Sequence, residues 1–387
     1  MKRFSLVLSP SGLLALCLMA AAMGLFVVQS AAAQYQQHNL VSDIPLLADH
    51  LDPNLVNPWG ISSSPTSPFW ISDNRTGVTT LYNGSGVPQA LVVTIPPPAG
   101  GTPPSAPTGQ VFASGLEFNL VGSTSPALFI FATEDGTISG WNAAAGTSAI
   151  RMVDNSGAGA IYKGLAVGNN GSANFLYAAN FHAGTIDVFD TSFASTTLAG
   201  SFTDPNLPSD FAPFNIQNIN GNLYVTYAKQ DALGQDDVAG AGNGFVDVYD
   251  TNGNLVRRLI SNGSLNSPWG LALATANFGA FSNNLLVGNF GDGLINAFDP
   301  TTGAFLGRLE DSNGDPISIQ GLWGLKFGNG GIGFDPNTLY FTAGVPGDGQ
   351  VEDHGLFGSI SVPEPSVLTL LGLGFIGLGG LRRRFKE

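Results

Sequence analysis

Carboxylate and amide side chains that follow short apolar runs are the groups in this 387-residue sequence best suited to chemistry. Oxygen ligands of this kind suit hard divalent cations, and a cation held among them could polarise the carbonyl of a lactone or ester. Asp and Asn are also ordinary turn residues, so solvated turns without a bound ion are the competing interpretation. The candidates are Asp73, Asn74, Glu134, Asp135, Asn180, His182, Lys229, Asp231, Asn289, Asp292, Asp348 and Asp353.

The sequence contains none of the common catalytic motifs, and we assign no catalytic residue. Its four histidines, at positions 38, 50, 182 and 354, form no His-x-x-x-His pair, which excludes a zinc protease of that type. The Gly-Ser-Gly at 84–86 has the wrong spacing for a nucleophile elbow. The glycine run 328–333 matches a dinucleotide-binding pattern, but it leads into a turn rather than the helix start that phosphate binding needs.

Composition and charge exclude several further classes. Lys and Arg number 14 against 28 Asp and Glu, so the net charge of −14 repels phosphate backbones and we expect no nucleic-acid partner. Hydrophobic residues make up 43% of the chain, enough for a large core, while 52 Gly and 24 Pro indicate frequent turns. The only cysteine, Cys17, lies near the N-terminus.

The N-terminus has the pattern of a secretory signal peptide spanning residues 1–33. A basic start at Met1–Arg3 is followed by an apolar stretch at 6–28 and by small residues at Ala31–Ala33. A membrane anchor is the alternative interpretation. Cleavage at this site would remove Cys17 and leave a chain without a thiol, which would exclude disulfides and cysteine-ligated zinc.

The C-terminus, residues 362–387, contains Pro363, Glu364 and Pro365, then an apolar stretch at 366–381 and an arginine cluster formed by Arg382, Arg383 and Arg384. The apolar stretch is short for a stable membrane span, so transient membrane contact is expected. This order of features resembles the PEP-CTERM sorting tail. The resemblance implies a Gram-negative bacterium, export machinery, and an exosortase that cuts near the Pro-Glu-Pro. A plain C-terminal anchor remains the alternative.

The region between the two ends repeats itself. Pro58–Ile61, Pro268–Leu271 and Leu322–Leu325 are near copies of one motif, and weaker copies fill the gap between them. Six equivalent positions, 49–55 residues apart, define six units: Gly60, Gly109, Gly164, Asn215, Gly270 and Gly324. Glycine at this position suits an innermost strand where backbones crowd, and the adjacent Trp could fill the wedge between units.

Each unit contains short runs with the apolar-polar alternation of β-strands. Second strands are predicted at 69–73, 129–132, 175–178, 223–226, 285–287 and 339–342. Third strands are predicted at 79–82, 137–141, 185–190, 245–250 and 294–299. Asp-Asn-Gly turns after the third strands predict a fourth.

Six such units predict an all-β, six-bladed β-propeller at residues 34–361, with four antiparallel strands in each blade. The last unit ends early, near Ile360. We therefore predict that the N-terminal segment 37–41 of the exported chain supplies its fourth strand and closes the ring.

The pattern in the first unit, Pro58–Ile61 followed by 70–74 and 79–83, resembles NHL-type repeats and the gluconolactonase-like six-bladed propellers. From about Asn39 to Ile360 the chain is similar to a family of secreted bacterial propellers that often carry PEP-CTERM tails. That resemblance implies fold and location but no activity. Gluconolactonase-like enzymes have a metal-binding Glu early in the first blade, whereas this sequence has Asn57–Gly60 there.

Two functions follow from these observations. The first is a non-catalytic binding or scaffold protein, in the cell envelope or outside the cell, whose partner is an extracellular polysaccharide or an envelope protein. The second is a lactonase or esterase that uses a divalent cation in the axial pocket. Beyond such a cation we expect no cofactor. If the second strands all run in the same direction, the candidate carboxylates and amides should share one rim of the propeller.

Overall fold

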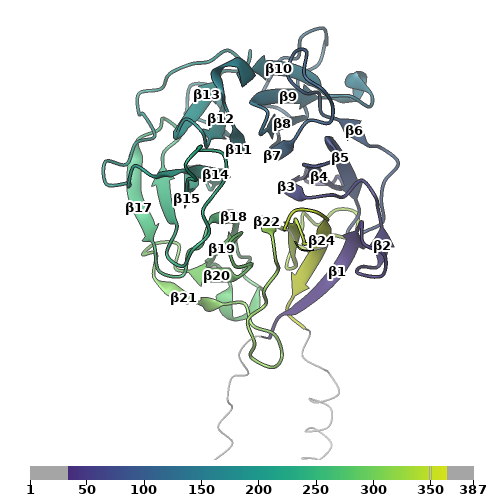
Figure 1. Cartoon of the computed structure of the whole chain (residues 1–387), viewed down its shortest axis with the longest axis vertical. Coiled ribbons are helices and arrows are strands. Elements are labelled where there is room, and N and C mark those ends of the chain that lie inside the picture. The colour runs from purple at the N-terminus through teal and green to yellow at the C-terminus, as the bar shows by residue number, and fades with distance from the viewer. Residues whose placement is uncertain (1–33, 348, 350, 364–387) are drawn as a thin grey trace, which may run out of the picture. The chain divides into compact units, whose positions relative to one another are not determined.

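Short antiparallel strands form nearly all the regular structure of the computed structural model, which describes residues 34–347, 349 and 351–363. The strands form six sheets arranged radially around an axis (Figure 1), and the all-β, six-bladed propeller is confirmed. The only helices in this part of the chain are three short 3-10 helices, at Ala143–Ala145, Ser156–Ala158 and Gly279–Phe281. None of its helices is long and apolar enough to cross a bilayer.

The predicted signal peptide, and the sorting residues Glu364, Pro365, Arg382, Arg383 and Arg384, lie outside the described residues. Pro363 is described and is exposed.

The first three blades follow in chain order. Blade 1 consists of β3 (Pro58–Ser62), β4 (Phe69–Asp73), β5 (Val78–Tyr82) and β6 (Val93–Thr94). Blade 2 consists of β7 (Pro107–Phe112), β8 (Phe129–Thr133), β9 (Thr137–Trp141) and β10 (Ile150–Asp154). Blade 3 consists of β11 (Tyr162–Asn169), β12 (Asn174–Asn180) and β13 (Thr185–Phe189).

The other three blades complete the ring. Blade 4 consists of β14 (Phe211–Ile219), β15 (Asn222–Lys229), β16 (Phe245–Tyr249) and β17 (Leu255–Ser261). Blade 5 consists of β18 (Pro268–Leu273), β19 (Leu285–Asn289), β20 (Ile295–Phe298) and β21 (Phe305–Arg308). Blade 6 consists of β22 (Leu322–Phe327), β23 (Leu339–Ala343), β24 (Leu356–Ser361), β1 (Gln36–Ser42) and the short parallel strand β2 (His50–Leu51).

Blade 3 differs from the others because its fourth strand is reduced to one bridge between Phe189 and Ser195. The chain turns at Asp190, whose carboxylate accepts the N–H groups of Ser192 and Ala194. The turn places Phe193, at a φ of 60°, in the core. The same carboxylate turn at Asp250 is followed by the full strand β17, so the turn by itself does not account for the missing strand.

The N-terminal strand closes the ring as predicted. β1 runs antiparallel to β24, with Gln36 opposite Ser361 and Ser42 opposite Leu356. Val41 is fully buried at this junction. A strand from one end of the chain therefore completes the sheet formed by the other end, and hydrogen bonds and packing alone hold the junction.

The six innermost strands contact each other in a ring. At the motif glycines the neighbouring backbone is so close that a β-carbon would collide with it. A β-carbon on Gly60 would lie 2.5 Å from the carbonyl oxygen of Thr108 in the next blade, and one on Gly324 would lie 2.7 Å from that of Trp59. The predicted crowding at the axis is therefore real, and only glycine permits this approach.

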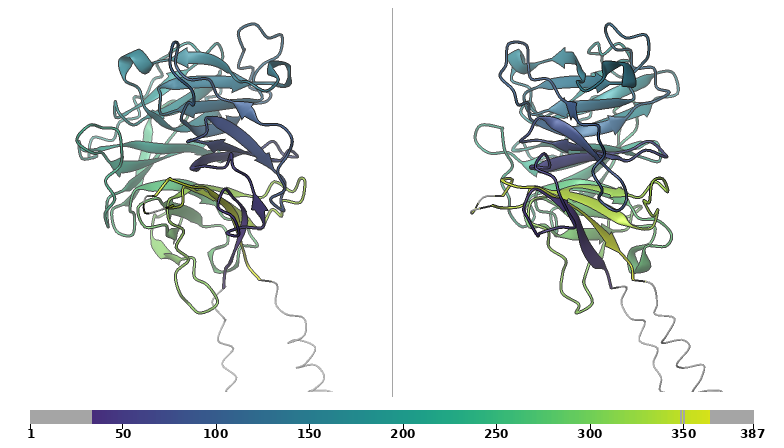
Figure 2. Two further views of the ribbon diagram at one scale, coloured as in Figure 1. Left: turned by 45° about the vertical axis from the view of Figure 1, so that its right-hand side comes forward. Right: turned by 90° about the vertical axis from the view of Figure 1, so that its right-hand side faces the viewer.

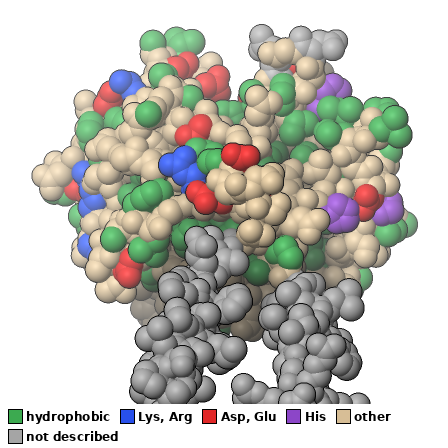
Figure 3. All heavy atoms as spheres, turned by 90° about the horizontal axis from the view of Figure 1, so that it is seen from below, with side chains coloured by type: hydrophobic (Ala, Val, Ile, Leu, Met, Phe, Trp, Pro, Cys, Tyr) green, Lys and Arg blue, Asp and Glu red, His purple; other side chains and the backbone are tan. Residues whose placement is uncertain are grey.

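The loops that join the strands project from both ends of the ring (Figure 2). Charged side chains are sparse on the face seen in Figure 3, where apolar and uncharged side chains cover most of the surface. This agrees with a charged content of only 11%. The stability of the ring therefore rests mainly on its interior.

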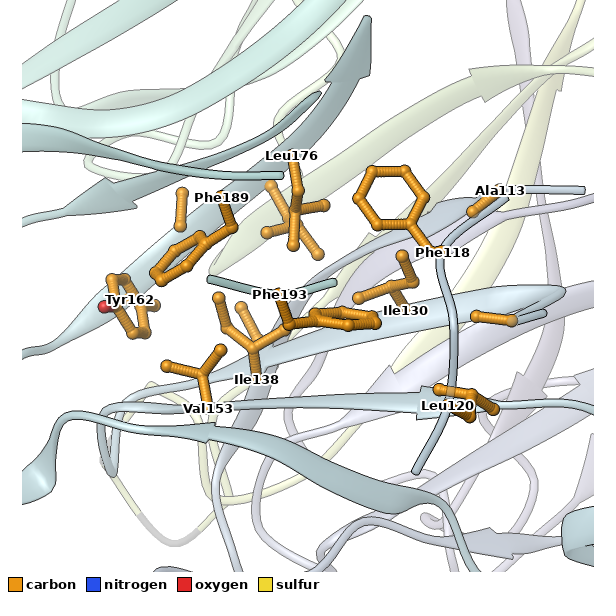
Figure 4. Close-up of a cluster of buried hydrophobic side chains, with 14 of the residues drawn as sticks. Ala113, Phe118, Leu120, Ile130, Ile138, Val153, Tyr162, Leu176, Phe189 and Phe193 are labelled. Carbon is orange, nitrogen blue, oxygen red and sulfur yellow. The ribbon is translucent and has the colours of Figure 1, made fainter. Parts of the chain in front are cut away.

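Packing between neighbouring sheets forms that interior. One cluster joins Ile130, Ile138 and Val153 of blade 2 to Leu176 and Phe189 of blade 3 (Figure 4). All are buried. Equivalent clusters lie between blades 1 and 2, 3 and 4, 4 and 5, and 6 and 1.

Candidate functional site

The centre of the propeller contains the side chains of the residues that precede the motif glycines and Asn215. In blades 1, 4, 5 and 6 this residue is aromatic: Trp59, Phe214, Trp269 and Trp323. The rings of Trp59 and Trp323 are stacked with centroids 3.5 Å apart, and Trp269 packs edge-on against both at 6.0 and 5.8 Å. These side chains contact each other across the axis, so the expectation that Trp fills the wedge between blades is wrong. We call Trp59, Phe214, Trp269 and Trp323, which together fill the axis, the axial aromatic cluster.

Blade 3 carries Lys163 at the same repeat position. Its Nζ lies 5.1 Å from the centre of the Trp59 ring, which suits a cation-π contact. The ammonium also pairs with Glu134 at 2.5 Å and with Asp236 at 3.5 Å. Burial is the largest effect and would lower the pKa of Lys163, but the combined attraction of Glu134, Asp236 and Glu352 outweighs it and the pKa is raised. Lys163 is therefore a fixed cation above the aromatic cluster.

Side-chain amides connect Lys163 to blade 6. Asn74 donates to Glu134 at 2.9 Å, and Asn57 donates to Asn74 at 3.3 Å and to Glu352 at 3.0 Å. The Trp323 indole donates to the Asn57 Oδ1 at 3.1 Å. We call Asn57, Asn74, Glu134, Lys163, Asp236 and Glu352 the axial polar network.

Glu352 is the member of the axial polar network whose pKa is shifted to near neutral. Burial raises its pKa to about 7, with a further contribution from the Glu134 charge, against the opposing effects of the Asn57 bond and the Lys163 charge. Its protonation therefore changes near neutral pH.

The predicted candidates Asn74 and Glu134 belong to this network, while Asn57, Lys163, Asp236 and Glu352 were not predicted as site residues. Lys163 had a visible signal, since it stands at the repeat position that carries Trp in three other blades. Asp236 and Glu352 had none, because each lies in a loop that only the fold brings to the axis.

The strand register places the ends of all six second strands at the same end of the blades, beside the starts of the innermost strands. Asp73 pairs with Pro58, Asn180 with Tyr162, and Asn289 with Pro268. We call this end the Asp73 rim. A shared rim does not bring these side chains into one site, because several bond within their own blade.

Four candidates are held inside or beside their blades. Asp73 is fully buried, accepts a 2.8 Å bond from Thr80, and has a pKa raised well above its usual value by burial. Asn180 donates to Asp187 at 3.0 Å. Asn289 donates to Asp292 at 3.1 Å. The polar groups of these side chains are therefore bonded to residues of their own blade.

The remaining candidates are dispersed. Asp135 accepts the Ala106 N–H at 2.7 Å, and burial raises its pKa. The other described members lie in surface turns or ion pairs: His182 near the Gly234 carbonyl, Lys229 with Asp210, Asp231 with the Leu233 and Gln235 N–H groups, and Asp353 with Arg75. Asp348 lies outside the described residues. The ligand role of the whole set stays a prediction.

Within residues 34–347, 349 and 351–363, no three His, Cys, Asp or Glu side chains are close enough to hold a metal ion together. Two acidic members of the axial polar network, Glu134 and Asp236, are both paired with the Lys163 ammonium.

The folded region is therefore a six-bladed β-propeller whose axis is filled by aromatic side chains. A model of the PEP-CTERM protein-sorting motif matches residues 361–384. The protein is thus a propeller with the motif that directs export, envelope sorting and exosortase processing, a system typical of Gram-negative bacteria.

The chain belongs to a family that includes two uncharacterised proteins of Acanthamoeba polyphaga mimivirus. It is 32% identical to one over 351 residues, 87% of this chain and 82% of the relative. It is 35% identical to the other over 312 residues, 78% of this chain and 80% of the relative.

Solved propellers are similar at lower identity. The virginiamycin B lyase of Staphylococcus aureus is 12% identical, with a TM-score of 0.49 over 85% of this chain and 99% of that protein. A protein of unknown function from Bacteroides thetaiotaomicron is 9% identical, with a TM-score of 0.49 over 85% of this chain and 76% of that protein.

Proposed function

We propose that the protein is an exported, non-catalytic binding protein of the cell envelope or the extracellular space. It presents the Asp73 rim to an extracellular polysaccharide or an envelope protein. The observation that carries this proposal is the position of the sorting motif relative to the rim. β24 starts beside Ala343, at the rim, and ends at Ser361, at the opposite end of the blade. The motif match begins at this same residue, 361.

Attachment through the C-terminal tail would therefore leave the Asp73 rim directed away from the membrane. β1 starts at Gln36, opposite Ser361, so the proposed signal-peptide cleavage site lies at the same end. Both processed ends leave the rim free for a partner.

Two loops supply the exposed part of the binding surface. The loop between β15 and β16 carries Leu233, which is 68% exposed, and Asp236, whose side chain is 78% exposed. The loop between β23 and β24 carries Glu352 and Val351, the latter 40% exposed. The carboxylates of these loops favour a neutral or basic partner over an acidic polymer.

The axial polar network supports binding rather than catalysis. Each of its side chains is engaged by another member, and Lys163 is almost fully buried. Such a network holds the two loops in place, which reduces the entropy lost when a partner binds them.

A pair of matched surface variants tests the proposal. The variant Leu233→Ser alters the rim, and Val121→Ser alters an equally exposed side chain, 75% exposed, in the loop between β7 and β8 at the other end. The full chain is immobilised and assayed by biolayer interferometry against purified neutral and acidic polysaccharides and envelope protein fractions. We expect Leu233→Ser, alone or with Asp236→Asn, to weaken binding at least tenfold and Val121→Ser to change it less than twofold.

Equal effects of the two variants would contradict the rim as the binding surface. Elemental analysis and hydrolysis of δ-gluconolactone test the enzymatic function in parallel. A stoichiometric divalent cation together with hydrolysis that chelation abolishes would replace the binding function by a cation-dependent lactonase.

A further inference from the structure

A second candidate site lies on the axis at the end opposite the Asp73 rim. The far halves of all six innermost strands surround a cavity of about 330 Å³. Trp269 lines this cavity and also belongs to the axial aromatic cluster, which therefore separates it from the axial polar network. The volume is at the small end of the range for ligand pockets, so a molecule of about monosaccharide size fits it.

Lys326 of β22 is the one charged residue among those that line the cavity. The side chain lies over Phe69, with Nζ 6.0 Å from the ring centre. Among the described residues, Lys326 makes no ion pair or side-chain hydrogen bond, and burial alone lowers its pKa. Lys163 differs, since Glu134 and Asp236 neutralise it.

Three neutral amide side chains in the walls of the cavity are held in place by hydrogen bonds. Asn215 donates to the Trp269 carbonyl at 2.7 Å, and Asn218 donates to the Val167 carbonyl at 2.9 Å. Gln110 donates to the Gly60 carbonyl at 2.9 Å. These amides hold neighbouring blades together, so the cavity keeps its shape without a ligand.

Three further polar side chains at the cavity are not used in this way. Ser62 and Ser63 of blade 1 and Gln217 of blade 4 line it, and none of the three side chains is bonded within the described part of the chain. The Ser62 hydroxyl is fully buried. Together with Lys326 of blade 6, Ser63 and Gln217 supply one ammonium, one amide and one hydroxyl from three separate blades.

We propose that this cavity binds a small carboxylate that also carries hydroxyl groups, with Lys326 as the counter-ion and Gln217 and Ser63 as hydrogen-bond partners. A charge-assisted hydrogen bond from an ammonium to a carboxylate is about twice as strong as a neutral one. The negative net charge of the chain opposes an anion at long range, but salt screens charges beyond about 10 Å. The site is independent of the Asp73 rim.

Calorimetric titration of the full chain with D-glucuronate tests this inference, with D-glucose as the neutral analogue of the same shape. We expect glucuronate to bind at least tenfold more tightly than glucose. Lys326→Met should lower glucuronate affinity at least tenfold, and Lys326→Arg should retain most of it. Lys229→Met, which removes a half-exposed lysine on the Asp73 rim, should change the affinity less than twofold.

The comparison of the two sugars on the unaltered protein decides the matter even if Lys326→Met fails to fold. Equal binding of glucuronate and glucose, or no binding of either, overturns the proposal. Unchanged glucuronate affinity in folded Lys326→Met also overturns it. Because polymer binding at the rim is measured with Leu233→Ser, failure of one site is distinguishable from failure of the other.

Discussion

Asn215 Nδ2 donates a 2.7 Å hydrogen bond to the carbonyl oxygen of Trp269 and so joins blade 4 to blade 5. At this repeat position the other five blades have glycine, and direct contact between backbones joins them. The Asn215 Oδ1 also accepts the Ile216 N–H at 2.8 Å. One side chain thus takes the place of a close backbone approach.

Asn215→Ala should destabilise the ring, because it leaves the buried Trp269 carbonyl and the Ile216 N–H without these partners. We expect the free energy of unfolding in urea to fall by about 1–3 kcal/mol. Asn254→Ala, which removes a bond to Asp250 in an exposed turn, is the matched control and should change it by less than about 0.5 kcal/mol. Equal losses of unfolding free energy in the two variants would mean that the bond to Trp269 contributes no more to stability than a bond in an exposed turn.

Gly324→Ala should strain the junction between blades 6 and 1, since the new β-carbon would lie 2.7 Å from the Trp59 carbonyl oxygen. Backbone atoms cannot rotate away, so we expect a loss of about 1–3 kcal/mol in the free energy of unfolding. Gly157→Ala serves as the control, because no atom lies within 4 Å of its added β-carbon. An unchanged melting temperature for Gly324→Ala would disprove the close approach.

Glu352→Gln should stabilise the protein at pH 8 and leave it nearly unchanged at pH 4. The pKa of Glu352 is about 7 in the folded state and near 4.5 when unfolded, so the folded state holds the extra proton between these values. Wild-type stability therefore falls as pH rises from about 4.5 to 7, by up to about 3 kcal/mol for this group. The charged groups facing it are Glu134, Lys163 and Asp236.

Urea denaturation of the wild type and of Glu352→Gln across this pH range measures the difference between their free energies of unfolding. The contributions of other buried acids cancel in this difference. A difference that does not depend on pH would exclude a raised pKa for Glu352.

Lys326→Met should raise the free energy of unfolding at pH 7 by about 0.5–1 kcal/mol, because it replaces a partly buried cation by an apolar side chain of similar length. Burial lowers the pKa of Lys326, so the cost of its charge is present below the folded pKa and disappears as pH rises through the unfolded value near 10.5. Lys229→Met, with its ion pair to Asp210, should give no gain. Destabilisation by Lys326→Met would indicate a partner for the ammonium and would weaken the case for the cavity.

Much of the fold could be predicted because the repeat is periodic. The predicted second strand at 69–73 and the third strand at 137–141 coincide with β4 and β9. Closure by segment 37–41 could be predicted because the last unit lacked the fourth strand that the repeat calls for. The reduced fourth strand of blade 3 could not be predicted, since the turn at Asp190 has the same form as the turn at Asp250, which is followed by the full strand β17.

The candidate site was predicted less well than the fold. Asp and Asn after a strand are favoured for turns and for ligands alike, and the sequence does not say which way a side chain points. Asp73 turned inward to Thr80, while Asn74, its neighbour, joined the axis.

The sequence alone determined that six strand-rich units follow one another and that a sorting motif ends the chain, because periodicity and sorting motifs are local in the chain. Only the tertiary structure decided that Lys163 and Glu352, 189 positions apart, share one network with Glu134. It also decided that Lys326 lies alone in a separate cavity. Closing the ring sets these distances, and no local pattern encodes which loops then reach the axis.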